Sequence, residues 1–240
     1  MLRHVPIGEA DRIVTIFTPE MGKVRAVARG VRRTRSKLSG HLEPLTYVAA
    51  SISHGRTLDV VSEAQTVRSF RGLREDLALM SKAVYLAELA DAFLAEREAG
   101  HDLFGLLSDC LAALESSAEP SRLLPWFEVR MLGLSGFGPE LHECVECRLR
   151  LEPGDYVYSS DLGGVVCDGC RAASSGPVLP LSLGANKVLR YYAGRDLGDA
   201  LDLAVPAPVS REVSRVLRSY IRHVLERELK SVEFMDLVAE

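Results

Sequence analysis

Four cysteines in two closely spaced pairs are the residues of this sequence best suited to bind a metal ion. They follow the pattern C-x2-C, nineteen intervening residues, C-x2-C, and are Cys144, Cys147, Cys167 and Cys170. Two thiolates separated by two residues can reach one ion from a tight turn, and two such turns complete a tetrahedral four-thiolate shell. Gly163, Gly164 and Gly169 fit the turns that these pairs need. The spacing therefore predicts one bound zinc ion.

We expect this zinc ion to be structural. A catalytic zinc ion normally has three protein ligands and an open position, whereas four thiolates close the shell. A redox dithiol fits one C-x2-C pair but not two at this spacing. A disulfide framework is disfavoured because Glu9, Asp11 and Arg12 stand where a signal peptide needs its apolar segment. The fifth cysteine, Cys110, lies in a helical pattern and is expected to be a small buried apolar residue.

A run of seven basic residues near the N-terminus predicts binding of a polyanion. The run consists of Lys23, Arg25, Arg29, Arg32, Arg33, Arg35 and Lys37. No acidic residue occurs from Met21 through Leu42. Each cation that neutralises a phosphate releases condensed counterions, so such a run can follow a nucleic-acid backbone. The alternative is a solvated edge strand whose charges discourage aggregation.

The net charge of the whole chain, -4, hides this basic segment. Residues 1–70 hold 11 Lys and Arg against 6 Asp and Glu, a balance of +5, whereas residues 71–240 hold 18 against 27, a balance of -9. Such asymmetry indicates that one part of the chain meets a polyanion and the other does not. Aromatic residues are scarce in the basic part, so we expect contacts with the nucleic-acid backbone more than base stacking.

The basic residues are expected to lie on a small β module. β-branched residues predict a strand over residues 11–18, and alternation with period two predicts a second over residues 23–29, with its basic side chains on one face. Residues 30–40 lack periodicity and are predicted to form a mobile basic loop. Two more strands are expected over residues 45–53 and 57–70.

Most of the remaining chain has the apolar spacing of amphipathic helices. The helices are expected over residues 73–98, 103–114, 121–134, 183–193 and 210–229. Between the cysteine pairs, residues 156–158 and 164–166 are expected to form a short hairpin, as in a zinc ribbon, and residues 174–180 to form a linker. The composition, 47% apolar and 26% charged, is that of a folded protein without a membrane span.

Two helix faces are further candidates for binding. Arg211, Arg215, Arg218 and Arg222 are spaced four, three and four residues apart and line one face. This face is either a second surface for a polyanion or an acidic peptide, or simply a solvated face. Trp126, with Arg122 and Arg130, suggests an apolar and basic groove for a partner, and the alternative is a tryptophan in the core.

The sequence lacks the common catalytic motifs. It contains no phosphate-binding G-x4-G-K-[ST], no G-x-G-x-x-G opening a helix, no G-x-S-x-G and no H-E-x-x-H. The H-x-E…P-C-x-x-C pattern of zinc deaminases is also absent. We therefore expect a protein that is not an enzyme. A zinc deaminase stays the least favoured alternative.

Four motifs, in the same order along the chain, resemble the bacterial RecO recombination-mediator proteins. They are GEADRIVTIFTPEMGKVRAVARGVRRTRSKLSGHLEPLT, YLAELADAFLAERE followed by LF, FEVRMLGLSGFGP, and the two cysteine pairs with GG before the second. The resemblance covers about residues 4–175 and is weaker beyond. It implies an α+β protein with an N-terminal OB fold, which is a small β-barrel, followed by a mostly helical domain that carries a four-cysteine zinc-ribbon-like insertion. The implied divisions are residues 1–70, 71–140, 141–175 and 176–240, the last consisting of helices that pack on the helical domain.

The resemblance also implies a function in DNA repair without catalytic turnover. Members of the family bind single- and double-stranded DNA and anneal complementary strands. Together with RecR they help RecA displace single-strand-binding protein, whose acidic C-terminal tail they recognise. A cytoplasmic location, associated with the nucleoid during repair, follows from this. The alternative is a zinc-ribbon regulator that binds nucleic acid without mediator activity.

The sequence departs from the family pattern at its start. Family members usually have a further short strand before the motif that begins near Leu2, so we expect the first strand of the OB fold to be incomplete. Some family members have lost the cysteines. Here all four are present, and the basic loop of the family matches Arg29, Arg32, Arg33, Arg35 and Lys37.

Overall fold

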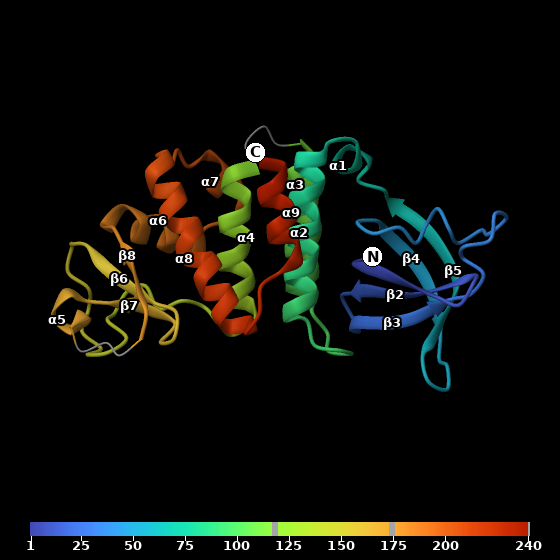
Figure 1. Ribbon diagram of the computed structural model, residues 1–240, viewed down its shortest axis with the longest axis horizontal. Helices are drawn as coiled ribbons and strands as arrows, with labels where there is room; N and C mark the ends of the chain where they lie inside the picture. The colour runs from blue at the N-terminus through green and yellow to red at the C-terminus, as the bar shows by residue number, and fades with distance from the viewer. Residues whose placement is uncertain (117–119, 173–175, 240) are drawn as a thin grey trace. The chain divides into compact units, whose positions relative to one another are not determined.

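The computed structural model describes residues 1–116, 120–172 and 176–239 of an α+β protein (Figure 1). The chain divides into two compact units. Unit 1 comprises Met1–Ser116 and Lys230–Glu240, and unit 2 comprises Ser117–Leu229. Among the described residues, no helix combines the length and the apolar character needed to cross a bilayer.

Unit 1 begins with a five-stranded sheet. Its strands are β1 (Arg3–Ile7), β2 (Asp11–Thr18), β3 (Gly22–Ala28), β4 (Tyr47–Ser53) and β5 (Asp59–Arg68), in the order β1-β2-β3-β5-β4. The pairs are antiparallel except for the short parallel contact of β3 with β5. The strands expected over residues 11–18, 23–29, 45–53 and 57–70 are confirmed within a few residues.

The sheet expected to form a small β-barrel does not close on itself among the described residues. Strand β1 pairs with β2 alone and β4 with β5 alone, so these two strands are the edges of the sheet. Pro6 lies in β1 and has no N–H to donate to a further strand, which fits an edge position. In the structure, all five residues of β1 pair with β2.

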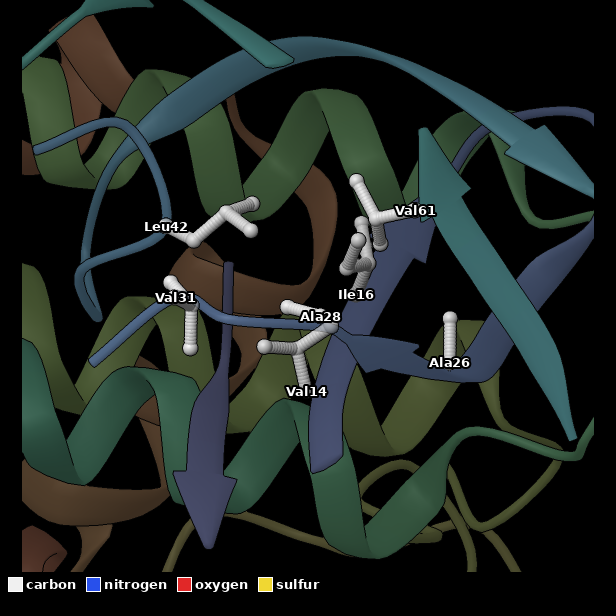
Figure 2. Packing of buried hydrophobic residues seen from close by; sticks show 7 residues of the cluster. All are labelled: Val14, Ile16, Ala26, Ala28, Val31, Leu42 and Val61. Atoms are coloured by element: carbon white, nitrogen blue, oxygen red, sulfur yellow. The ribbon is translucent and has the colours of Figure 1, made fainter. Parts of the chain in front are cut away.

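The core of the sheet also anchors the basic loop (Figure 2). Val14 and Ile16 from β2 and Ala26 and Ala28 from β3 are buried together with Val61 of β5. Figure 2 shows that Val31 and Leu42, one near each end of the loop, join this cluster, and both are fully buried. The loop that we expected to be mobile is thus fixed at both ends by burial of apolar surface.

Unit 1 contains four helices among its described residues, and two of them replace the single helix expected over residues 73–98. They are α1 (Arg71–Glu75), α2 (Leu77–Phe93), α3 (His101–Ser116) and α9 (Lys230–Ala239). Asp76 is extended and caps α2, its carboxylate accepting a hydrogen bond from the backbone N–H of Leu79 at 3.0 Å. Residues 94–98 are not helical because they run beside β3, where Glu96 bridges to Gly22 and Lys23.

The chain returns to unit 1 through α9. The helix expected over residues 210–229 ends at Leu225, since Glu226 adopts a left-handed conformation. The carboxylate of Glu88, on α2, then accepts hydrogen bonds from the N–H groups of Lys230 and Ser231 at 3.1 and 2.8 Å. This caps the start of α9, which packs against α2.

Unit 2 combines helices with a second, small sheet. Its helices are α4 (Pro120–Leu134), α5 (Asp168–Arg171), α6 (Leu183–Gly194), α7 (Leu197–Asp202) and α8 (Ala207–Leu225), and α4 packs against α6, α7 and α8. Its strands are β6 (Tyr156–Ser159), β7 (Gly164–Val166) and β8 (Val178–Leu181), in the order β7-β6-β8. The expected hairpin is confirmed. The expected linker over residues 174–180 is wrong where β8 pairs with β6, and residues 174 and 175 lie outside the described residues.

Candidate metal centre and nucleic-acid interface

The two cysteine pairs converge on one point of unit 2. The Sγ atoms of Cys144, Cys147, Cys167 and Cys170 all lie within 4.8 Å of one another. The Sγ atoms of Cys147 and Cys167 are 3.9 Å apart. Zinc binds thiolates at about 2.3 Å in a tetrahedron, which places the sulfurs roughly 3.8 Å from each other. The four sulfurs therefore have the spacing of a closed zinc site.

Tight backbone turns bring the cysteines together. The first pair lies in a turn in which the N–H of Arg148 donates to the carbonyl of Cys144 at 2.8 Å. In the second, the N–H of Cys170 donates to the carbonyl of Cys167 at 3.1 Å. Gly164 is required between them, because a Cβ there would lie 2.5 Å from Cγ1 of Val145 and 2.7 Å from the carbonyl oxygen of Glu140. Cys144 itself is fully buried beside the small sheet.

The hydrogen bonds at this site favour the thiolate form of Cys144 even without a metal ion. Burial raises the pKa of the Cys144 thiol, but N–H donors from Cys167, Cys147 and Glu146 outweigh it and lower that pKa to about 6. The neighbouring thiol of Cys167 raises the pKa of Cys170 to about 12. A second negative charge is disfavoured among sulfurs so close together, and a divalent cation removes that repulsion. The donor set therefore fits zinc, and within the described part of the chain the cluster consists of four thiols alone.

Cys110 lies in unit 1 and takes no part in this site. It is fully buried on α3, as expected for a small apolar residue. Burial raises the pKa of its thiol well above the ordinary value, which keeps it protonated and unreactive.

Six of the seven predicted DNA-binding residues are exposed on unit 1. Arg25 projects from β3, whose side chains alternate between buried and accessible positions. The others follow in the anchored loop and are Arg29, Arg32, Arg33, Arg35 and Lys37. The backbone N–H of Arg32 donates to the carbonyl of Ala10 at 2.9 Å, which fastens the loop to the β1–β2 turn. The structure thus presents these cations together on one supported segment.

Lys23 differs from the other members of the basic run. Its side chain is 17% exposed, and its Nζ lies 3.3 Å from Oδ1 of Asp91 on α2. Nζ also donates a hydrogen bond to the carbonyl oxygen of Asp91 at 2.7 Å. Lys23 therefore links β3 to α2, a contact that no local sequence pattern indicates.

The three residues proposed as a partner groove form contacts inside unit 2. Trp126 is 6% exposed, and its Nε1 donates to the carbonyl of Arg195 at 2.9 Å. Arg122 and Arg130 donate to the carbonyls of Leu201 and Ala193 at 2.6 and 2.9 Å. These bonds join one face of α4 to the C-terminal ends of α6 and α7, where carbonyl groups lack helical partners. A partner-binding role for the three residues stays a prediction.

Two features of unit 1 have no signal in the sequence because long-range packing creates them. The carboxylate of Asp59 is 4% exposed and lies 2.7 Å from Nη2 of Arg97 and 2.8 Å from Nδ1 of His54. An apolar cavity of about 310 Å³ is lined in part by Phe17 and Phe104. The two rings meet edge to face, with centroids 5.4 Å apart. The residues of each feature come from separate elements.

Comparison with known proteins identifies the family. The model of the Recombination protein O N terminal family matches residues 1–70, and that of the Recombination protein O C terminal family matches residues 74–233. The chain belongs to the RecO family of DNA repair proteins. It is 37% identical over 236 residues to a DNA repair protein RecO of Dehalococcoides mccartyi, covering 98% of this chain and 92% of that protein.

Two further RecO relatives are similarly close. The DNA repair protein RecO of Symbiobacterium thermophilum is 38% identical over 231 residues, which are 95% of this chain and 91% of the relative. That of Roseiflexus sp. is 36% identical over 240 residues, which are 100% of this chain and 84% of the relative. The resemblance read from the sequence motifs is thereby confirmed, and with it a place among RecO-family DNA repair proteins.

Proposed function

We propose that this protein is a recombination mediator that binds single- and double-stranded DNA, anneals complementary strands and, with RecR, helps RecA load onto DNA coated by single-strand-binding protein. The observation that carries the proposal is the basic loop of unit 1, anchored by Val31 and Leu42 and free of acidic residues. Fixed cations of one sign attract the phosphate backbone without reading its sequence. That property suits a protein that must act on any DNA.

The fold proposed for the first 70 residues is an OB fold, which is a five-stranded and partly open barrel. The strand order β1-β2-β3-β5-β4 and its open edges support this assignment. For residues 141–175 we propose a zinc-ribbon-like module, supported by the sheet of β6, β7 and β8 beside the cysteines. Residues 71–140 and 176–240 would then form the helical framework.

The proposed mechanism is electrostatic and involves no catalytic turnover. The exposed cations of β3 and the loop neutralise phosphates, which lessens the repulsion between two DNA strands brought together for annealing. Bound zinc would supply a rigid cross-link between the two cysteine turns, and Cys144, Cys147, Cys167 and Cys170 would hold it. Contacts with RecR and with the acidic tail of single-strand-binding protein would direct this activity to coated DNA in the cytoplasm.

Binding of a fluorescent single-stranded oligonucleotide at increasing salt tests the proposal. Log affinity should fall with log salt by about 0.7 per phosphate contact. The variant Arg33→Glu with Arg35→Glu should flatten the slope by about 1.4. The matched control is Arg71→Glu with Arg227→Glu, an equal change of charge at exposed positions outside the loop. If the loop variant and the control variant lose the same amount of DNA affinity, the assignment of the loop as a DNA-binding surface is wrong.

Annealing separates mediator activity from simple DNA binding. Complementary strands coated with single-strand-binding protein should anneal faster with the wild-type protein, and RecR should allow RecA to assemble on them. Intact DNA binding with no effect on coated strands would favour the alternative, a zinc-ribbon regulator that binds nucleic acid.

A further inference from the structure

Helix α8 of unit 2, labelled in Figure 1, carries a row of exposed arginines. Arg211, Arg215 and Arg222 are exposed, and Arg218 falls in the same row by its spacing. At 100° per residue, positions 211, 215 and 222 lie within roughly 40° of one another around the helix axis. The buried side chains of α8, including Val213, Val216 and Tyr220, occupy the opposite side. The row extends for about 16 Å along the helix.

Three arginines of this row are unpaired within the part of the chain that the structure describes. Arg211, Arg215 and Arg222 form no ion pair with any side chain of the described residues. The one acidic residue of α8, Glu212, accepts hydrogen bonds from the N–H and the hydroxyl of Ser182, both at 2.7 Å. Its carboxylate is therefore directed to the start of α6 and not to the row.

The arrangement weakens the helix in the absence of a ligand. Arg211 and Arg215 are four residues apart, and like charges at this spacing repel. An ordinary solvated helix face mixes both signs, so that such pairs attract. A bound polyanion would remove the repulsion in α8.

The chemistry of the row favours a nucleic-acid backbone over an acidic peptide. Peptide recognition needs apolar anchors beside the charges, and no large apolar side chain of α8 is exposed. Arginine matches phosphate through two parallel N–H···O hydrogen bonds, and regularly spaced phosphates suit a straight row of such groups. Backbone contacts of this kind require no side chain that reads bases.

We propose that α8 is a second nucleic-acid-binding surface, which holds a sugar-phosphate backbone through Arg211, Arg215 and Arg222. It lies in unit 2, whereas the basic loop lies in unit 1. The proposal goes beyond the proposed function because the α8 site does not require the loop to bind DNA. With both sites present, one chain binds two strands at once.

The test counts the oligonucleotides that the full-length protein binds. Single-stranded oligonucleotides of about ten nucleotides, too short to wrap around large surfaces, are titrated at low salt where binding is tight. Wild-type protein should bind two per chain. The α8 variant, Arg215→Glu with Arg222→Glu, should bind one, as should the loop variant, Arg33→Glu with Arg35→Glu. The control variant, Arg71→Glu with Arg227→Glu, should bind two.

The outcomes separate the two sites. One oligonucleotide per wild-type chain, or two per α8 variant, would overturn the α8 proposal. If the loop variant binds two oligonucleotides per chain and the α8 variant binds one, the loop assignment is wrong and the α8 proposal is supported. A labelled poly-glutamate peptide is the probe for an acidic protein partner. If the α8 variant loses that peptide but keeps both oligonucleotides, the surface binds protein and the proposal fails.

The fold of unit 2 in the α8 variant is checked by Trp126 fluorescence, because the chain has one tryptophan and it lies in this unit. Should the Glu substitutions unfold unit 2, Arg215→Gln with Arg222→Gln removes the positive charge without adding a negative one. The same loss of one oligonucleotide per chain is expected from this variant, and retention of both would overturn the proposal.

Discussion

Lys23 and Asp91 form a link between the sheet and the helices of unit 1. Nζ of Lys23 lies 3.3 Å from Oδ1 of Asp91, and Nε of Arg3 lies 2.8 Å from Oδ2 of the same carboxylate. Lys23 and Asp91 have side chains that are 17% and 15% exposed, so water screens their attraction only in part. One carboxylate on α2 thus holds cations from both β1 and β3. Within the basic run, Lys23 stabilises the fold.

Replacing Lys23 should therefore affect stability more than DNA binding. Lys23→Gln leaves the half-buried carboxylate of Asp91 with one cation fewer, and we expect the free energy of unfolding to fall by about 1–3 kcal/mol. Urea unfolding followed by circular dichroism measures this loss. Lys37→Gln, at an exposed position of the same run, should change the unfolding midpoint little and the salt dependence of DNA binding more. The reverse pattern would return Lys23 to the DNA-binding surface.

The cysteine cluster should bind one zinc ion that contributes to folding. Cys144→Ser or Cys167→Ser removes one thiolate of four, so the purified protein should contain less than one equivalent of zinc by elemental analysis. Its unfolding temperature should fall as well, since the free energy of metal binding adds to that of folding. Cys110→Ala removes a buried thiol outside the site and should leave the zinc content unchanged. A metal-free wild-type protein of equal stability would contradict the zinc assignment.

Local patterns predicted those elements whose own residues determine them. The sequences of strands β2 and β3 have the pattern of β-strands, and the spacing of the four cysteines alone predicts the cluster that they form. The break between α1 and α2 was missed because Asp76 also fits the polar side of a continuous helix. Burial of Val31 was missed because charged neighbours obscure a single apolar residue in a loop.

Contacts between distant residues were beyond the reach of such patterns. The bond from Trp126 to the carbonyl of Arg195 spans 69 residues, and the bond from Lys23 to the carbonyl of Asp91 spans 68. Contacts at such separations produce no periodic pattern in the sequence. Six members of the basic run are exposed, and their binding of DNA stays a prediction, whereas Lys23 pairs with Asp91 inside unit 1.

Acid should weaken unit 1 through Asp59. A hydrogen bond with His54, together with the guanidinium of Arg97, holds the pKa of the Asp59 carboxyl below its ordinary value. A lowered pKa means that the stabilising contribution is present above the unfolded value, about pH 3.9, and is lost as pH falls through the folded value.

Unfolding of the wild type and of Asp59→Asn, followed in urea between pH 7 and pH 3, checks this direction. The wild type should be the more stable at pH 7, and the difference should shrink below about pH 4, where the carboxyl takes up a proton. Asp109→Asn, at an exposed position on α3, serves as the control and should show little difference at any pH. If the difference in unfolding free energy between wild type and Asp59→Asn stays constant down to pH 3, Asp59 is not the cause of the acid sensitivity.

Trp126 should stabilise unit 2, whether or not it also meets a partner. Trp126→Phe keeps an aromatic ring but removes the Nε1–H that donates to the carbonyl of Arg195. Arg195 is exposed, so water replaces part of the lost hydrogen bond, and its loss should cost about 0.5–1.5 kcal/mol and lower the urea midpoint measured by circular dichroism. Binding of a labelled peptide that carries the acidic tail of single-strand-binding protein is measured in parallel on the folded protein. If Trp126→Phe has the urea midpoint of the wild type but no longer binds the peptide, the indole contacts a partner instead. Its packing inside unit 2 would then contribute nothing measurable to stability.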